Sequence, residues 1–222
     1  MEETLKIIGT SHIAKQSKQD IKKAFSEFQP DIIAVELDPQ RLKALTSNEK
    51  PTLGIAALKQ VGLTGYLFAI IGRFVQRKLG RIVDITPGEE MLLASRIAKK
   101  NKLMLALIDQ SMHVTLRNVS NKVTRKEKFK MLWDVIASPF SKKMKIDLRK
   151  VPKDEFIEKI MEQMKDRYPG LYSALLDDRN RYMADKIKKI QEKYPEKKLL
   201  VVVGAGHKKG IIEYLQENSA NV

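Results

Sequence analysis

Four short hydrophobic runs divide the chain, and each has the length of a buried β-strand. They cover residues 5–8, 32–37, 103–108 and 199–203. The second run is apolar except for Glu36, as expected for a parallel strand covered by helices on both faces. Between the first two runs, apolar residues recur at helical spacing, Ser17 with Asp20 resembles a capping box, and Pro30 ends the helix. This order predicts a right-handed βαβ unit.

The rest of the chain has mainly helical patterns. Helices are expected over much of residues 41–100, with one start at Thr86-Pro87-Gly88-Glu89, and over most of residues 120–195. A short helix over residues 211–215 follows the last strand. The expected fold class is α/β, with a small, mostly parallel sheet and a large helical insertion between the third and last strands. Residues 1–222 are expected to form a single domain.

Composition narrows the class of protein. The chain has no cysteine, which excludes disulfides and thiolate metal sites. No run of eighteen apolar residues occurs, and the acidic start does not resemble a signal peptide. We therefore expect a cytoplasmic location, with membrane association in a longer natural form. The most apolar segment, residues 61–75, predicts a contact surface that forms a homodimer or docks onto a membrane domain absent from this chain.

The formal net charge is +15, and the excess is uneven. Residues 122–150 hold ten Lys and Arg against three Asp and Glu, with Trp133 and Phe140 among them. Such a charge suits nucleic acid, anionic lipid headgroups or simple solubility. No recognition helix or stacking signature accompanies it, so nucleic acid is unlikely as a partner and a solvated basic helix pair is favoured.

The candidate chemistry begins with two copies of one pattern at opposite ends of the chain. Gly9-Thr10-Ser11-His12 follows the first predicted strand, and Gly204-Ala205-Gly206-His207 follows the last. A glycine-rich turn at the carboxyl end of a parallel strand is a usual ligand position. Two of the only three histidines occupy it, which predicts a shared site and, most simply, a metal site.

Glu36 is the candidate third metal ligand or general base, because a carboxylate inside an apolar strand needs a metal or a charged partner. A structural ion pair with Arg41 or another arginine is the alternative. Two imidazoles and a carboxylate suit Zn, Mn or Co, and a metal-bound water is a nucleophile near neutral pH. Asp38 and Asp109 also fall at predicted strand ends, where acids often only cap the next loop.

Arginine could supply the positive charge of the site. Arg179 and Asn180 lie in the last long predicted helix, with Asn180 on its apolar face. Arg179 could bind a substrate carboxylate or an oxyanion, or form a buried ion pair that ties the helical insertion to the sheet. His113, after the third strand, is expected in a loop near the surface. The partial dinucleotide pattern at residues 204–206 is a weak signal, because its third glycine is misplaced.

Six segments in order resemble the TraB family, also called TraB/PrgY pheromone-shutdown proteins, within the Tiki-like superfamily. They are residues 9–12, 34–38 with Arg41, 87–91, 108–109 with 115–117, 177–184, and 203–207. The resemblance implies an α/β fold with paired Gly-x-x-His motifs. It also implies metal-dependent hydrolysis, because Tiki-like members are regarded as metalloproteases, and a peptide signal as substrate. Asp178 departs from the glutamate usual there, and similar archaeal proteins often continue into a membrane domain.

Residues and resemblance together predict a metal-dependent hydrolase that acts on a peptide. The alternative is a non-catalytic module that binds a peptide or small ligand. The expected site has three groups of residues: catalytic Glu36, Arg179 and Arg117; metal-binding His12, His207 and Glu36; and substrate-binding Arg41, Asp109, Asn180 and Glu90.

Overall fold

The fold is built on one parallel sheet. A computed structural model describes residues 3–10, 14–47, 62, 88–137 and 154–217. Its four strands are β1 (Leu5–Thr10), β2 (Ile32–Val35), β3 (Met104–Leu107) and β4 (Leu199–Gly204). They lie in the order β1-β4-β2-β3, and every neighbouring pair is parallel. The last strand of the sequence therefore lies in the interior of the sheet, between the first two.

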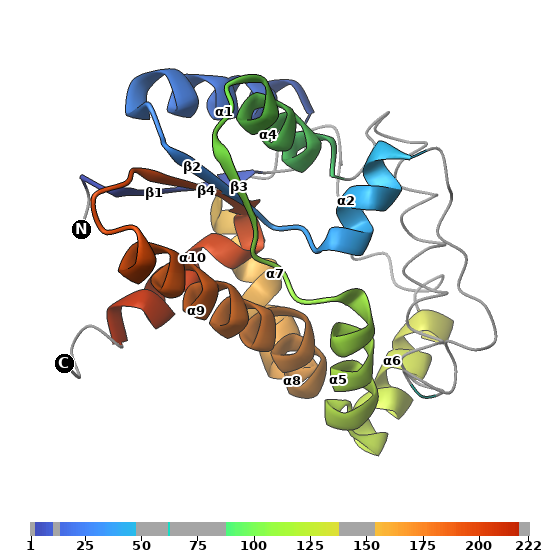
Figure 1. Cartoon of the computed structure of the whole chain (residues 1–222). Helices are drawn as coiled ribbons and strands as arrows, with labels where there is room; N and C mark the ends of the chain where they lie inside the picture. Colours follow the sequence, from blue (N-terminus) through green and yellow to red (C-terminus); the bar gives the residue numbers. More distant parts are fainter. Residues whose placement is uncertain (1–2, 11–13, 48–61, 63–87, 138–153, 218–222) are drawn as a thin grey trace.

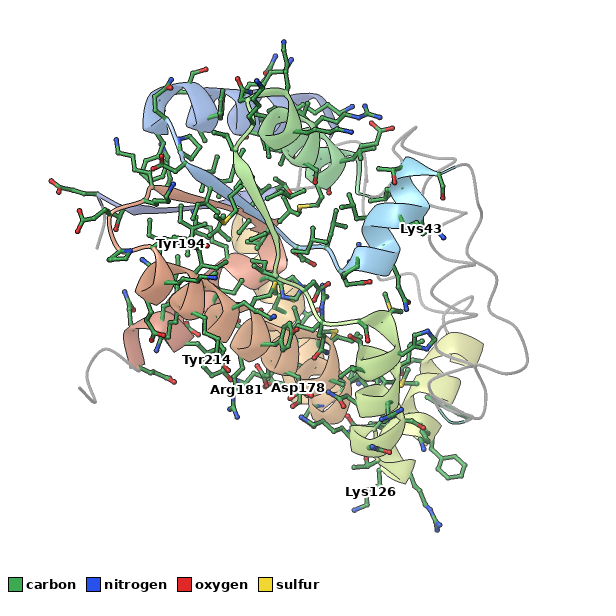
Figure 2. The ribbon with its side chains drawn as sticks, viewed as in Figure 1. Lys43, Lys126, Asp178, Arg181, Tyr194 and Tyr214 are labelled. Atoms are coloured by element: carbon green, nitrogen blue, oxygen red, sulfur yellow. The ribbon has the colours of Figure 1, made fainter. Side chains whose placement is uncertain are left out.

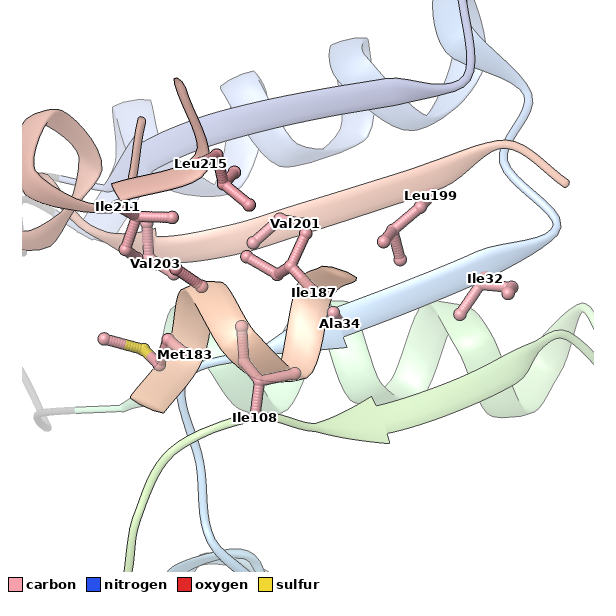
Figure 3. Close-up of a cluster of buried hydrophobic side chains, with 11 residues drawn as sticks. Ile32, Ala34, Ile108, Met183, Ile187, Leu199, Val201, Val203, Ile211 and Leu215 are labelled. Carbon is pink, nitrogen blue, oxygen red and sulfur yellow. The ribbon is translucent and has the colours of Figure 1, made fainter. Parts of the chain in front are cut away.

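Helices cover both faces of the sheet, as Figure 1 shows. On one face pack α1 (Ala14–Phe28) and α4 (Glu89–Lys100), and on the other α9 (Asp178–Lys193) and α10 (Ala205–Glu217). In β2, Ile32 and Ala34 face α9 and α10, whereas Ile33 and Val35 face α1 and α4. Figure 3 shows the first of these two hydrophobic clusters. Both faces are dry, so β2 and β4 are apolar throughout.

A helical region extends from the carboxyl ends of the strands. After β2 comes α2 (Pro39–Thr46), and after β3 come α5 (Met112–Lys122), α6 (Arg125–Ala137) and α7 (Asp154–Arg167). The short α8 (Pro169–Tyr172) and one π-helical turn, η2 (Ser173–Asp177), lead into α9. This confirms the α/β class and a helical insertion between the third and last strands.

Of two helix starts predicted in the amino-terminal half, the first is wrong and the second is only partly described. Helix α1 begins at Ala14, so Ser17 lies inside the helix and its buried hydroxyl does not cap it. Helix α4 begins at Glu89, after Gly88 with φ of 94°, a left-handed conformation that glycine adopts without strain. The proposed start at Thr86 and Pro87 falls on residues outside the described part of the chain.

Two further predictions fail because helices begin earlier than expected. His113 lies in the first turn of α5, not in a loop. The expected glycine-rich turn at residues 204–206 is absent, since Gly204 ends β4 and Ala205 begins α10. His207 is therefore a first-turn residue of a helix that follows the strand without a loop.

Residues 61–75 lie almost entirely outside the described part of the chain. Gly62 alone is described, and a Cβ there would lie 2.5 Å from the Ser120 hydroxyl oxygen. The homodimer, or a docked membrane domain, therefore stays a prediction. Among the helices that are described, none has the length and hydropathy needed to cross a bilayer.

Helices α9 and α10 approach closely at Gly210. A Cβ on Gly210 would lie 2.2 Å from the Asn180 amide nitrogen, so Gly210→Ala must displace the Asn180 side chain or push the two helices apart. We expect this variant to lose about 1–3 kcal/mol of unfolding free energy. Gly206→Ala is the matched control in the same helix, because its Cβ would meet Met161 at an ordinary 3.7 Å. Urea unfolding of both variants measures this, and equal stabilities would refute the close packing.

Candidate functional site

Glu36 is the first polar residue after β2, and it continues the alternation of that strand. It follows Ile32 and Ala34 on the sheet face that α9 and α10 cover, and it is 8 % exposed. Its Oε2 accepts a hydrogen bond from the Gly204 N–H at 2.7 Å. Its Oε1 accepts one from the Arg179 guanidinium. Glu36 thus joins the carboxyl ends of β2 and β4 to helix α9.

Arg179 forms the centre of the site. Its Nε and Nη2 donate to the two carboxylate oxygens of Asp109, at 3.0 and 2.7 Å, in a bidentate pair. Its Nη2 also donates to Glu36, and its Nη1 to His207 Nε2 at 2.9 Å. One guanidinium therefore binds the residues that follow β2 and β3 and the first turn of α10.

These contacts define the tautomer of His207. A guanidinium N–H can only donate, so His207 Nε2 accepts and the ring proton lies on Nδ1. That Nδ1–H donates to the Asn180 side-chain oxygen at 2.7 Å. The Nε2 atom lies 3.4 Å from Glu36 Oε1. The imidazole is therefore held from one side by Asn180 and directs its lone pair toward Arg179 and Glu36.

The charges of the cluster follow from these partners. Burial alone would raise the pKa of Glu36, but the protonated form of His207 present at acidic pH, the Arg179 guanidinium and the Gly204 N–H lower it to about 2. Burial, with Arg179 adding to it, lowers the pKa of His207. Burial opposes ionisation of Arg179, yet Glu36 and Asp109 raise its pKa. At neutral pH the site therefore holds charged Glu36 and Arg179 beside a neutral imidazole.

The π-helical turn η2 positions the two residues that α9 contributes. It ends at Asp177, and Asp178 begins α9. One extra residue in a turn shifts the following side chains around the helix axis. Arg179 and Asn180 are consecutive, and both reach His207. A π turn has no side-chain signature, so the sequence could not predict this feature.

The structure brings together five of the predicted site residues: Glu36, Asp109, Arg179, Asn180 and His207. Arg41 joins them through Asp109, to which its Nη1 donates at 3.3 Å. The ion pair of Glu36 is thus with Arg179, one of the alternatives left open. Asp109, for which the sequence provides only weak evidence of a role in the site, is 6 % exposed and pairs with both arginines.

Four other residues singled out in the sequence have settings of their own. Arg117 is exposed on α5, and Glu90 is buried in the first turn of α4, on the opposite face of the sheet from α9. Asp178 accepts hydrogen bonds from Asn118 and Lys122. Asp38 caps α2, through hydrogen bonds from the Gln40 and Arg41 N–H groups.

His12 lies outside the described residues. The strand before it does end beside the strand before His207, because Thr10 pairs with Gly204. A shared site of His12 and His207 therefore stays a prediction.

As arranged, the described residues do not form a metal site. His207 Nε2 and Glu36 Oε1, two of the predicted ligand atoms, both accept hydrogen bonds from Arg179, whose positive charge lies where the ion would bind. No other group of three His, Asp or Glu in the described ranges is placed to hold a metal. A divalent ion held by His12, His207 and Glu36 would have to displace this guanidinium.

A cavity of about 310 Å³ lies beside the cluster, between α9 and α10. Asn180 and Gly210 line it, together with Arg181 and Tyr214, whose side chains lie close together in Figure 2. Its remaining lining residues are Lys165, Tyr172, Asp177, Glu213 and Glu217. Asn180 therefore contacts His207 on one side and this cavity on the other.

The lowered pKa of His207 predicts a pH dependence of stability. In the unfolded chain the His207 imidazole has a pKa near 6.5, whereas burial lowers its pKa in the folded protein. Below about pH 6.5 the unfolded state therefore binds the proton more readily, and stability should fall. The slope due to one such group approaches about 1.4 kcal/mol per pH unit. His207→Gln should flatten the curve in this range. Urea unfolding between pH 7 and pH 5 measures it, and parallel curves for the two proteins would contradict the buried neutral ring.

Comparison with known proteins identifies relatives of this chain. It is 34 % identical over 215 residues to an uncharacterized protein of Methanocaldococcus jannaschii, covering 95 % of this chain and 53 % of that protein. It is 26 % identical over 190 residues to the TraB domain-containing protein of Mus musculus, covering 80 % of this chain and 50 % of that protein. The human TraB domain-containing protein is 25 % identical over 190 residues, with the same coverage. The chain spans about half the length of these relatives.

A family model agrees with these similarities. It matches residues 2–222, nearly the whole sequence, which includes both Gly-x-x-His segments and every residue of the Arg179 cluster. The chain therefore belongs to the TraB/PrgY/gumN family.

Proposed function

We propose that the Arg179 cluster is the catalytic centre of a hydrolase that acts on a peptide. The observation that carries the proposal is the state of His207: buried, neutral, fixed in one tautomer, and with its Nε2 lone pair beside a cation and an anion. A neutral imidazole oriented by a hydrogen bond at Nδ1 is suited to accept a proton from water. The peptide substrate rests on the family resemblance.

The other members of the cluster would have different roles. Hydrolysis requires a water molecule to replace Arg179 Nη1 at His207 Nε2. This water attacks the peptide carbonyl carbon while His207 Nε2 takes its proton, and the N–H groups of Arg179 stabilise the negative charge on the carbonyl oxygen. The peptide C–N bond then breaks, and His207 returns the proton to the leaving amine. Glu36 is a poor general base, since its pKa of about 2 lies far below neutral pH. It keeps Arg179 in place and stays ionised.

A second candidate function is ligand binding without turnover. It is favoured by the complete pairing of Arg179, which donates to Asp109, Glu36 and His207 at once. In that case the paired guanidinium would not be available to stabilise an oxyanion, and a peptide would bind beside the cluster without being cleaved. The two functions differ in whether new peptide termini appear.

Peptide turnover by the full chain tests the hydrolase. The protein is incubated with a mixed peptide library, with a chelator or with added Mn, Co or Zn, and mass spectrometry detects new termini. We expect cleavage, and His207→Gln should lower its rate at least about 100-fold, as for the loss of a general base. His113→Gln is the matched control, since His113 lies on α5. The absence of cleavage under every condition, or equal rates for His207→Gln and the unaltered protein, would overturn the proposal.

Metal binding can be tested apart from turnover. We propose that a divalent ion and the Arg179 guanidinium compete for Glu36 and His207, which both contact Arg179. Arg179→Met should then raise the affinity for Mn or Zn at least about tenfold, because it frees an ionised carboxylate and an imidazole. Glu36→Gln and His12→Gln should lower it. Equilibrium dialysis measures these affinities, and no binding by Arg179→Met would reject the metal site.

A further inference from the structure

Helix α6 has an unusual distribution of side chains, since both of its acids are bound to neighbouring groups while two aromatic residues face outward. Phe129 is 74 % exposed and Trp133 is 69 % exposed. They are four positions apart, so they share one face of the helix. From this face we infer a docking site for the surface of an anionic lipid membrane. Residues Lys126, Phe129, Lys130 and Trp133 form it, and they are called the outer face of α6 below.

The inner face of α6 fixes the rotation of the helix. Glu127 is 4 % exposed and accepts hydrogen bonds from the Thr124 hydroxyl at 2.8 Å and the Gly170 N–H at 2.7 Å. Two helical turns further along, the Asp134 carboxylate accepts hydrogen bonds from the Arg167 guanidinium, with Arg167 Nε at 2.7 Å, and from the Tyr168 hydroxyl. These bonds attach both ends of the helix to α7 and α8. Rotating α6 to bury its aromatic residues would break them.

The charge of the outer face favours an anionic surface. Lys126, Lys128 and Lys130 are exposed, and so is Arg125. Of the two acids in this helix, Glu127 is buried and Asp134 is paired with Arg167. Lys126 lies at the far end of the helical region, away from the sheet (Figure 2). The outer face therefore combines aromatic side chains with a net positive charge.

Aromatic and basic residues on one helix face are typical of a helix that lies in the plane of a membrane. Trp and Phe enter the boundary between headgroups and acyl chains, while Lys binds anionic headgroups. A nucleic acid would also attract the lysines. It would, however, stack bases on aromatic residues placed along a groove or a sheet, and here the two rings lie on a convex helix. The basic stretch of the sequence thus has a specific role at its amino-terminal half.

The chain contains one tryptophan, Trp133, so the face carries its own reporter. The full chain is mixed with vesicles of phosphatidylcholine alone or of phosphatidylcholine with phosphatidylglycerol. We expect co-sedimentation and a shift of tryptophan emission to shorter wavelength with the anionic vesicles only. Lys126→Gln/Lys130→Gln should weaken binding about 25-fold, at about fivefold for each lysine. Phe129→Ser should weaken it as well.

Lys99→Gln/Lys100→Gln is the matched control, because it removes the same charge from exposed lysines at the end of α4. Circular dichroism checks that each variant is folded. An unchanged emission spectrum with anionic vesicles would overturn the inference. Equal weakening of vesicle binding by the α4 variant would also overturn it, because it would mean general charge attraction. Association of the chain with a soluble protein or a nucleic acid in place of vesicles would overturn it as well. The hydrolase proposal does not depend on this result, since α6 carries none of the cluster.

Discussion

One largely buried guanidinium connects the sheet, the helical region and the candidate site. Arg179 is the cation that balances Glu36 and Asp109 at the carboxyl ends of two strands. Removing one partner of such a buried pair typically costs about 3–5 kcal/mol, because the other charge remains without compensation. Replacing the whole group by apolar residues often costs nothing. Stability alone therefore does not require this cluster, which is consistent with a chemical role.

The cluster also explains why the helical region has a defined orientation to the sheet. Four segments of the chain meet at Arg179: the ends of β2 and β3, the start of α9 and the first turn of α10. Asn180 and Gly210 fix the distance between α9 and α10, since the amide lies where a larger residue would have its Cβ. Any change that alters this distance would move His207 relative to Glu36.

The sequence predicted the sheet because its physical signal is simple. A strand that is buried on both faces appears in the sequence as a continuous apolar run, and β2 and β4 consist of such runs. Glu36 and Asn180 were found for a related reason, since a polar residue on an apolar face needs a partner. The ion-pair partner of Glu36 could not be predicted, because nothing in the sequence selects Arg179 over Arg41. The direct passage from Gly204 to Ala205 and the π turn η2 were missed, as both are defined by backbone hydrogen bonds.

The strand order has a consequence for how the chain folds. β4 lies between β1 and β2 in the sheet, yet it begins at Leu199. During synthesis, β1 and β2 have no shared neighbour until residues 199–204 have been made, so a shorter nascent chain cannot complete the sheet. Pairing of such distant segments makes folding slow and leaves apolar strands open to aggregation meanwhile. His207 follows β4 directly, so it reaches the cluster only when β4 has paired in the sheet. The cluster therefore cannot be complete before the sheet is complete.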